Sequence, residues 1–196
     1  MDRRKKKISE SNVSFNPSTP YAISKLSCEL YIKNLIKSSG FNAIIARFSN
    51  FYGPGQPYYR LIPKIILSIL KKKKFPIHGK GKSKRNFIFS DDFCSGIYKI
   101  ITKGATGKTY HFSGNKLYTV IEILIKVSNL MGKNFKKITK KTLDRRGKDS
   151  IYNISSDLTK KDLNWVCKTD IDTGISKMID FTIKYYKETK KLSMEY

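Results

Sequence analysis

The sequence has few acidic residues, few cysteines and no long apolar run. Fifteen aspartates and glutamates stand against 40 lysines and arginines. Cys28, Cys94 and Cys167 lie far apart in no metal-ligand spacing, which argues against disulfides and a zinc site. No apolar run reaches the roughly 18 residues of a membrane helix, and no apolar segment follows the basic opening residues. We therefore expect a cytoplasmic protein with no membrane contact and no metal.

The formal net charge of +25 is the most unusual feature of the composition. Such a charge favours attraction to polyanions, namely nucleic acid, anionic membrane or a phosphorylated substrate. Lysine greatly outnumbers arginine, however, as expected where the nucleotide bias of a genome fills exposed positions with lysine. The lysine run 71–74 has no interleaved aromatics and matches no nucleic-acid motif. We expect no nucleic-acid partner and keep a basic polyanion-binding protein as an alternative.

Apolar spacing and turn residues predict helices that alternate with short strands. The chain has 196 residues, of which 39% are hydrophobic, enough for a sizeable core. Helices are expected over 21–37, 61–70, 91–102, 119–131, 157–163 and 172–186, and strands over 42–48, 75–78, 86–89, 109–112 and 135–139. Strands separated by helices are typical of an α/β fold with a largely parallel sheet.

Tyr21 and Lys25 stand four residues apart at the start of the first predicted helix, so they share one face. A lysine ammonium beside a tyrosine stabilises the phenolate form and suits the tyrosine to act as a base. The spacing alone is weak evidence, because Tyr186 and Lys190 repeat it. Only Tyr21 follows a proline-containing turn and precedes an apolar strand that ends in a glycine loop. This context favours Tyr21 and Lys25 as the functional pair.

Four segments in order carry a resemblance to a known family. Residues 16–25, Asn-Pro-Ser-Thr-Pro-Tyr-Ala-Ile-Ser-Lys, resemble the active-site segment of the extended short-chain dehydrogenases, the NAD-dependent epimerase/dehydratase family. Residues 47–56 are similar to the family's Arg-x-x-Asn-x-Tyr-Gly-Pro loop, and residues 60–63 to the substrate-side stretch after it. Residues 78–92 resemble its Gly-x-Gly…Arg-Asp-hydrophobic-Val-x-Asp stretch. The ordered series is more specific than any single motif.

Later segments extend the resemblance to roughly residues 8 to 187. Residues 110–115 resemble the family's Tyr-Asn-hydrophobic-Gly-Gly element, and residues 144–149 with 163–165 resemble Asp-Arg-Pro-Gly-His-Asp…Leu-Gly-Trp. Within the family, the Leu-Ile-Pro and Asp-Arg-x-Gly segments look most like dTDP-glucose 4,6-dehydratases. UDP-sugar epimerases share most of these motifs, so the choice between dehydratase and epimerase stays open.

The resemblance implies which residues would form a site. Tyr21 and Lys25 would be catalytic and would contact NAD together with Ser49. A nucleotide-diphosphate sugar would be bound by Asn50, Arg60, Arg85, Asn115, Arg145 and Lys148. Arginines suit a diphosphate because their planar forks grip its oxygens with two hydrogen bonds. The implied reaction is transient oxidation of the sugar at C4, in which Tyr21 takes the hydroxyl proton as hydride passes to NAD.

The resemblance also implies an incomplete enzyme. Members of the family begin with a strand, a Gly-x-x-Gly-x-x-Gly turn and a helix that hold the cofactor pyrophosphate, and the sequence contains no such turn and lacks the catalytic Ser or Thr. The expected fold is α/β: the C-terminal part of a Rossmann-type parallel sheet plus a small α/β substrate-binding domain. Expected divisions are a disordered or extended lead-in, a remnant of the NAD-binding domain, a mainly substrate-binding region and a tail, at 1–13, 14–56, 57–188 and 189–196.

Three functions remain open at this stage. The first is a dehydratase or epimerase that either is complemented by a separate N-terminal polypeptide or is an inactive product of a truncated reading frame. The second is a non-catalytic module that binds a nucleotide sugar or a partner enzyme, and the third is a polyanion-binding protein. Relatives commonly dimerise through the helix that corresponds to 21–37, so a homodimer is a further expectation.

Overall fold

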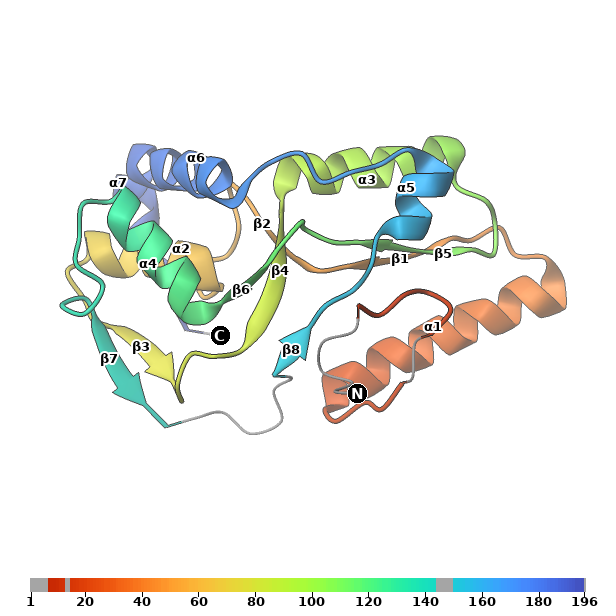
Figure 1. Ribbon diagram of the computed structural model, residues 1–196, viewed down its shortest axis with the longest axis horizontal. Helices are drawn as coiled ribbons and strands as arrows, with labels where there is room; N and C mark the ends of the chain where they lie inside the picture. Colours follow the sequence, from red (N-terminus) through yellow and green to blue (C-terminus); the bar gives the residue numbers. More distant parts are fainter. Residues whose placement is uncertain (1–6, 13–14, 144–149, 196) are drawn as a thin grey trace.

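The computed structural model describes residues 7–12, 15–143 and 150–195, which form seven helices and eight strands (Figure 1). The elements follow the order α1 (Pro20–Ser39), β1 (Ile45–Phe48), β2 (Asn50–Tyr52), α2 (Leu61–Leu70), β3 (Phe75–His78), β4 (Lys84–Phe89), α3 (Ser90–Lys103), β5 (Thr109–Phe112), β6 (Leu117–Thr119), α4 (Val120–Leu130), β7 (Thr139–Thr142), β8 (Ile151–Tyr152), α5 (Asp157–Leu163), α6 (Ile171–Lys184) and α7 (Tyr186–Thr189).

The strands form three small sheets in which parallel pairing predominates. β1 pairs in parallel with β5, β2 with β4, and β3 with β7, while β6 runs antiparallel to β4 and β8 pairs in parallel with β4. Only Ser49 separates β1 from β2, so the chain changes its neighbour from β5 to β4 at this residue. The predicted α/β class with a mainly parallel sheet is confirmed.

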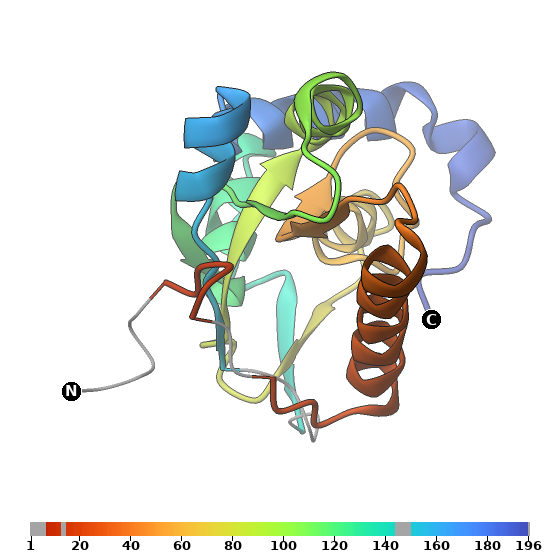
Figure 2. The same ribbon diagram turned by 90° about the vertical axis from the view of Figure 1, so that its right-hand side faces the viewer.

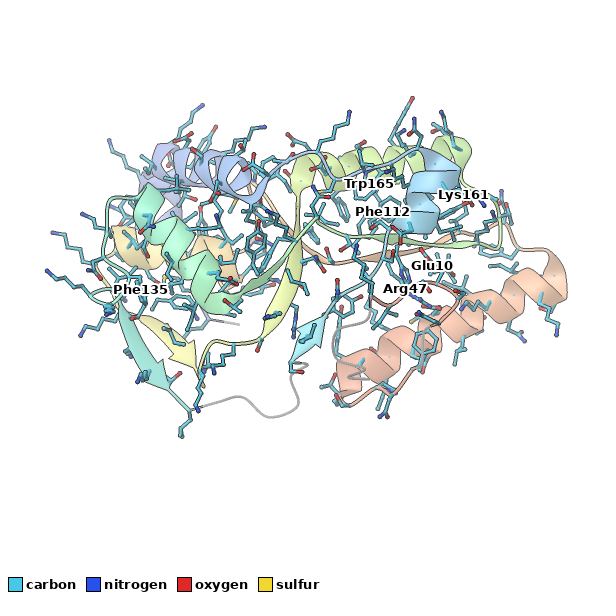
Figure 3. All side chains as sticks on the ribbon, viewed as in Figure 1. Glu10, Arg47, Phe112, Phe135, Lys161 and Trp165 are labelled. Carbon is cyan, nitrogen blue, oxygen red and sulfur yellow. The ribbon has the colours of Figure 1, made fainter. Side chains whose placement is uncertain are left out.

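Two hydrophobic cores hold these sheets and their helices. The larger core lies where α2, α4 and α6 pack together, and α2 contributes Ile62, Ile65 and Ile66 to it. The smaller core lies around Phe112 and Trp165, which point toward each other in Figure 3 with ring centroids 4.9 Å apart. The β1–β2 strand switch therefore lies between the two cores.

Helix α1 lies below the β1–β5 sheet, on the face opposite α3, in both Figure 1 and Figure 2. Thr19 caps it by accepting a hydrogen bond from the Ala22 N–H at 3.2 Å, and Pro20 fills the first turn. Gly40 ends it in the left-handed conformation with φ 66°. None of its 20 residues is buried. The helix therefore gains little stability from packing against the described part of the chain.

Three short strands and one shifted strand differ from the predictions. The predicted strand 135–139 is wrong: turns occupy this stretch, and β7 begins at Thr139. Phe135 and Ile138 pack against the larger core from these turns, which explains why their spacing resembled a strand. Strands β2, β6 and β8 have only three, three and two residues, too few for a pattern to reveal them.

The start of the chain is tied to the sheet where it is described. Ile8 bridges in parallel to Ile154, and its N–H donates to the carbonyl of Asn153 at 2.8 Å. The carboxylate of Glu10 accepts from the backbone N–H of His111 at 2.8 Å. Residues 1–6 and 13 of the expected lead-in lie outside the described residues. The stretch 7–12 is therefore held against β5 and the segment after β8.

The three cysteines are free thiols, of which Cys28 and Cys94 are exposed and Cys167 is buried. The described residues contain no group of three His, Cys, Asp or Glu side chains arranged to hold a metal ion. Over the same ranges, no helix combines the length and the apolar character needed to cross a bilayer.

Candidate functional site

Tyr21 and Lys25 lie in the first turns of α1, with the Lys25 Nζ 5.8 Å from the centre of the Tyr21 ring. At this distance the ammonium is within reach of the ring's electrons. The Tyr21 side chain is 72% exposed, so its hydroxyl is open to a ligand. The structure thus brings the predicted pair together on one face at the exposed start of a helix.

A cleft of about 680 Å³, here called the tyrosine cleft, opens beside Tyr21. It lies between the start of α1, the β1–β2 strand switch and the start of α2. Four residues predicted to bind ligand line it, namely Tyr21, Ser49, Asn50 and Arg60. The rest of its wall comes mainly from aromatic side chains of the strands and from the turn 53–57.

Ser49 places a polar atom in the wall of the tyrosine cleft. The residue is buried, and its N–H donates to the carbonyl of Phe112 at 2.9 Å. Its Oγ is buried without a hydrogen-bond partner among the described residues. A buried hydroxyl that makes no hydrogen bond is costly, so a polar ligand atom in the cleft would gain by pairing with it.

A second cleft of about 280 Å³, here called the apolar slot, lies between α2, β3, β4 and β6. Its walls are mostly aromatic and aliphatic, and its charged side chains are Lys64 and Arg85. It is lined by Asn50, Tyr59, Leu61, Lys64, Phe75, Pro76, His78, Gly81, Ser83, Arg85, Phe87, Tyr118 and Val120. An apolar slot with a few cations suits a ligand that joins an aromatic ring to an anion.

The two clefts share Asn50, Leu61 and Phe87, so they adjoin. Among the described residues, no carboxylate lines either of them, and the cations are Arg60, Lys64 and Arg85. The whole stretch 30–90, which builds most of both walls, contains no aspartate or glutamate. The combined site is therefore positively charged and suits an elongated anionic ligand.

Two of the three predicted arginines reach the clefts, and they come from different elements. Arg85 lies on β4, and its Nη1 donates to the carbonyl of Lys84 at 2.8 Å. Arg60 directly precedes α2, with its guanidinium carbon 5.3 Å from the centre of the Tyr59 ring. The sequence prediction missed Lys64 and the aromatic residues of the slot. For Lys64 the one signal was its place directly after the Arg-Leu-Ile-Pro segment.

Asn115 is not brought together with the other predicted residues. It lines a separate depression of about 190 Å³, and its Nδ2 donates to the carbonyl of Cys167 at 3.0 Å. This hydrogen bond holds the segment between α5 and α6. Arg145 and Lys148, the remaining predicted substrate contacts, lie outside the described residues.

A partly buried network of charges positions α1 against the sheet. The carboxylate of Glu29 accepts from the Nε of Arg47 at 2.9 Å and from its Nη2. The Arg47 Nη1 lies 2.8 Å from the Nε2 of His111, and Glu10 accepts from the backbone of His111. Figure 3 shows Glu10 and Arg47 close together below the sheet. The network therefore fixes α1, and with it Tyr21, relative to β1 and β5.

Within this network His111 is neutral. Arginine only donates hydrogen bonds, so the Nε2 of His111 must accept and its proton sits on Nδ1. Burial lowers the pKa of His111, and together with a smaller effect of Arg47 it outweighs the Glu10 carboxylate, which would raise this pKa. Burial alone would raise the pKa of Glu29, but hydrogen bonds and charges from Arg47 and Lys33 outweigh it and lower the pKa. The ion pair therefore stays charged while the imidazole stays neutral.

Tyr52, the tyrosine of the Arg-x-x-Asn-x-Tyr-Gly-Pro motif, has a structural place. Its side chain is 2% exposed, and its hydroxyl donates to the carbonyl of Ile171 at 3.5 Å. Burial raises its pKa far above the ordinary value for tyrosine. Tyr52 therefore packs the larger core as a neutral phenol, whereas Tyr21 is exposed beside the tyrosine cleft.

Comparison with known proteins identifies relatives over almost the whole chain. Residues 2–113 match the model of the NAD dependent epimerase/dehydratase family. A dTDP-glucose 4,6-dehydratase of Escherichia coli is 30% identical over 188 residues, which cover 91% of this chain and 51% of that protein. One from Mycolicibacterium smegmatis is 31% identical over 171 residues, covering 85% and 50%. The chain thus spans about half the length of the curated relatives it matches.

Solved structures of the same class share the fold. The dTDP-glucose 4,6-dehydratase of Bacillus anthracis, in complex with NAD, superposes with a TM-score of 0.89 at 28% identity, covering 94% of this chain and 58% of that one. The enzyme from Streptomyces venezuelae with NAD and TYD bound gives 0.89 at 25% identity, covering 93% and 56%. The matched domain, the relatives and the shared fold agree with the ordered motifs: the chain belongs to the NAD-dependent epimerase/dehydratase family, whose cofactor is NAD.

Proposed function

We propose that this chain is the nucleotide-sugar-binding part of an NAD-dependent enzyme that resembles the dTDP-glucose 4,6-dehydratases. The observation that carries the proposal is the pair of adjoining clefts, which run from the exposed Tyr21 to Arg85 and have no carboxylate in their described walls. An anionic ligand with an aromatic base at one end and a sugar at the other fits this arrangement of charge and apolar surface.

The proposed substrate is a nucleotide-diphosphate sugar that lies along both clefts. Its base would occupy the apolar slot beside Leu61 and Phe75, where aromatic walls offer stacking. Its diphosphate would lie between Asn50 and Arg85, since Asn50 belongs to both clefts. Its sugar would then extend into the tyrosine cleft toward Tyr21.

The proposed chemistry uses residues of the tyrosine cleft. NAD, when bound, supplies the acceptor for the hydride that leaves the sugar carbon. The phenolic oxygen of Tyr21 takes the proton of the sugar hydroxyl, and the ammonium of Lys25 stabilises the phenolate. The unpaired Ser49 Oγ in the cleft wall fits a polar atom of the cofactor or the sugar, so the residues present fit this end of the cofactor.

The proposal also covers the units that the chain would need or bind and its location in the cell. The 196 residues contain no Gly-x-x-Gly-x-x-Gly turn, so turnover is proposed to need a cofactor-binding unit in addition to these residues. The exposed apolar residues of α1 also admit a second copy of the chain. The three free thiols suit the reducing cytoplasm as the place of action.

Calorimetric titration with dTDP-glucose and UDP-glucose tests the proposal. We expect at least one of them to bind with a dissociation constant in the micromolar range, and free glucose to give no heat. Replacing Lys103 by alanine is the control, because this exposed lysine ends α3 and lines neither cleft. If neither sugar nucleotide binds, the proposal is contradicted. Binding without turnover in the presence of a cofactor-binding unit would instead support a non-catalytic module.

A second candidate function, polyanion binding, has one observation in its favour. Because β3 pairs with β7, the lysine run 71–74 lies beside the lysines of residues 133–141. Within the described residues, none of these lysines forms an ion pair. Titration with duplex DNA at two salt concentrations distinguishes this function, since it predicts a steep loss of affinity with salt and no preference for sugar nucleotides.

A further inference from the structure

The lining of the apolar slot comes from two groups of elements. Asn50 and Arg85 belong to β2 and β4, which pair side by side. A second group of lining residues belongs to α2 and to β3, which follows α2 in the chain and packs against it: Leu61, Lys64, Phe75, Pro76 and His78. Lys64 therefore brings a permanent positive charge to a part of the slot that is otherwise mainly apolar.

Lys64 contributes its side chain to the slot. Its backbone N–H donates to the carbonyl of Arg60 at 2.9 Å, and its carbonyl accepts from the Oγ of Ser68 at 2.7 Å, so both backbone groups are paired within the helical segment. Lys64 follows Leu61 by three residues, a spacing that puts two side chains on one face of a helix. The Lys64 side chain thus lies next to Leu61, where we place the base of the substrate.

The surroundings of Lys64 differ from those of a solvated surface lysine. Lys64 is partly buried, whereas the lysines 72–74 beyond the end of α2 are exposed. Within the described ranges its ammonium has neither a hydrogen bond nor an ion pair. The first turn of α2 contains no acidic residue, and the helix dipole disfavours a cation at this end. Lys64 would therefore gain from an acceptor on a bound ligand.

The position of Lys64 indicates which part of the ligand carries that acceptor. Under the proposed function the diphosphate lies between Asn50 and Arg85 on the strands β2 and β4, so the base is the part beside α2 and β3. Uracil and thymine carry two ring carbonyls that accept hydrogen bonds, whereas adenine carries none. The slot volume of about 280 Å³ lies just below the roughly 300–1,000 Å³ of typical ligand pockets, which favours a base with a single ring.

We propose that Lys64 is a specificity-determining residue, whose ammonium donates a hydrogen bond to a ring carbonyl of a uracil or thymine base in the apolar slot. Arg85 then binds the diphosphate, which all nucleoside diphosphates share, and Lys64 distinguishes between their bases. Adenine would leave the ammonium without this partner inside the slot, and its affinity would be lower for that reason. The inference rests on the proposed function, from which it takes the position of the base.

Calorimetric titration with UDP and with ADP tests this role, because the two ligands share ribose and diphosphate and differ only in the base. Lys64→Met keeps a long apolar side chain of similar helix propensity and removes the donor. Lys71→Met is the matched control, since Lys71 caps the other end of α2 and lines neither cleft. Thermal unfolding followed by circular dichroism checks that both variants fold.

We expect the unmodified chain to bind UDP at least about tenfold more tightly than ADP. Lys64→Met should lose about tenfold or more in affinity for UDP and less than about threefold for ADP, and Lys71→Met should change neither. Equal losses for UDP and ADP in Lys64→Met would assign Lys64 to the diphosphate and overturn the inference, as would equal binding of both by the unmodified chain. In these two cases dTDP-glucose still binds and the proposed function stands. If UDP, ADP and dTDP-glucose all fail to bind, the proposed function is contradicted as well.

Discussion

Among the proposed substrate contacts, Arg85 is the one expected to bind the diphosphate most directly. Its guanidinium carries charge into a slot that has no carboxylate among its described lining residues. A hydrogen bond to a charged group contributes about 1.5–3 kcal/mol, so Arg85→Ala should weaken dTDP-glucose binding roughly 10- to 100-fold by calorimetry. Arg85→Lys should fall between, because lysine keeps the charge and loses the planar fork. Equal affinity in all three proteins would show that the diphosphate lies elsewhere.

His111 should make the stability of the fold depend on pH. Burial lowers its pKa in the folded protein below the ordinary value of 6.5, so the unfolded chain binds the proton first. The stabilisation is therefore fully present above pH 6.5 and is lost as pH falls from there toward the folded pKa. The loss is at most about 1.4 kcal/mol per pH unit for one proton. Denaturant unfolding between pH 5 and 8 measures it.

The variant His111→Gln isolates this effect. A glutamine oxygen can still accept from the Nη1 of Arg47, and the amide does not titrate in this range. We expect the slope of stability against pH between 5 and 6.5 to become shallower in the variant. An unchanged slope would assign the pH dependence to other groups and contradict the neutral state of His111.

At the scale of elements, the close approach of α6 to β2 depends on a glycine. A Cβ built on Gly174 would lie 2.1 Å from the Tyr52 hydroxyl oxygen and 2.8 Å from its ring carbon Cζ. Gly174→Ala should therefore destabilise the fold by about 1–3 kcal/mol through overpacking, although alanine favours helix by roughly 1 kcal/mol. Thermal or urea unfolding measures the change.

Two variants control for that interpretation. Ser176→Ala, at an exposed position of the same helix, should be neutral or slightly stabilising. Adding Tyr52→Phe to Gly174→Ala should recover part of the loss, because it removes the hydroxyl that the new methyl group meets. If the double variant is no more stable than Gly174→Ala, the clash with Tyr52 does not explain the effect.

Elements with a long amphipathic pattern could be predicted from the sequence. The helix predicted over 61–70 is α2 with the same bounds, because its apolar face fills the larger core and a lysine run follows it. The strand predicted over 109–112 is β5. By contrast β7, Thr-Lys-Lys-Thr, is an exposed edge strand with no apolar alternation, and its position follows from pairing with β3 rather than from its own residues.

At the scale of the whole molecule, the sequence could predict those site residues that belong to a family motif. Tyr21, Ser49, Asn50 and Arg60 meet in one cleft because the α1 start and the β1–β2 switch converge there. The slot was not predictable, since its walls come from four separated elements that only tertiary packing assembles. Asn115 was predicted to contact the ligand from its local sequence; the structure places it in a separate depression, where its amide donates to the carbonyl of Cys167, and the contact stays a prediction.

The net charge of +25 predicts how binding responds to salt. A diphosphate neutralises about two charges of the site, so the affinity for dTDP-glucose should fall only about tenfold between 50 and 200 mM salt, whereas a polyanion that spans six to ten phosphates loses about 10³–10⁵. Calorimetry at the two salt concentrations measures this slope. A steep fall for dTDP-glucose would indicate that it binds the diffuse lysine surface instead of the clefts.

A crystal structure of the chain with dTDP-glucose tests the central claim most directly. We predict the base in the apolar slot beside Leu61 and Phe75, the diphosphate between Asn50 and Arg85, and the sugar facing the hydroxyl of Tyr21. A ligand bound only on the lysine surface near residues 71–74, or a sugar that points away from Tyr21, would contradict it.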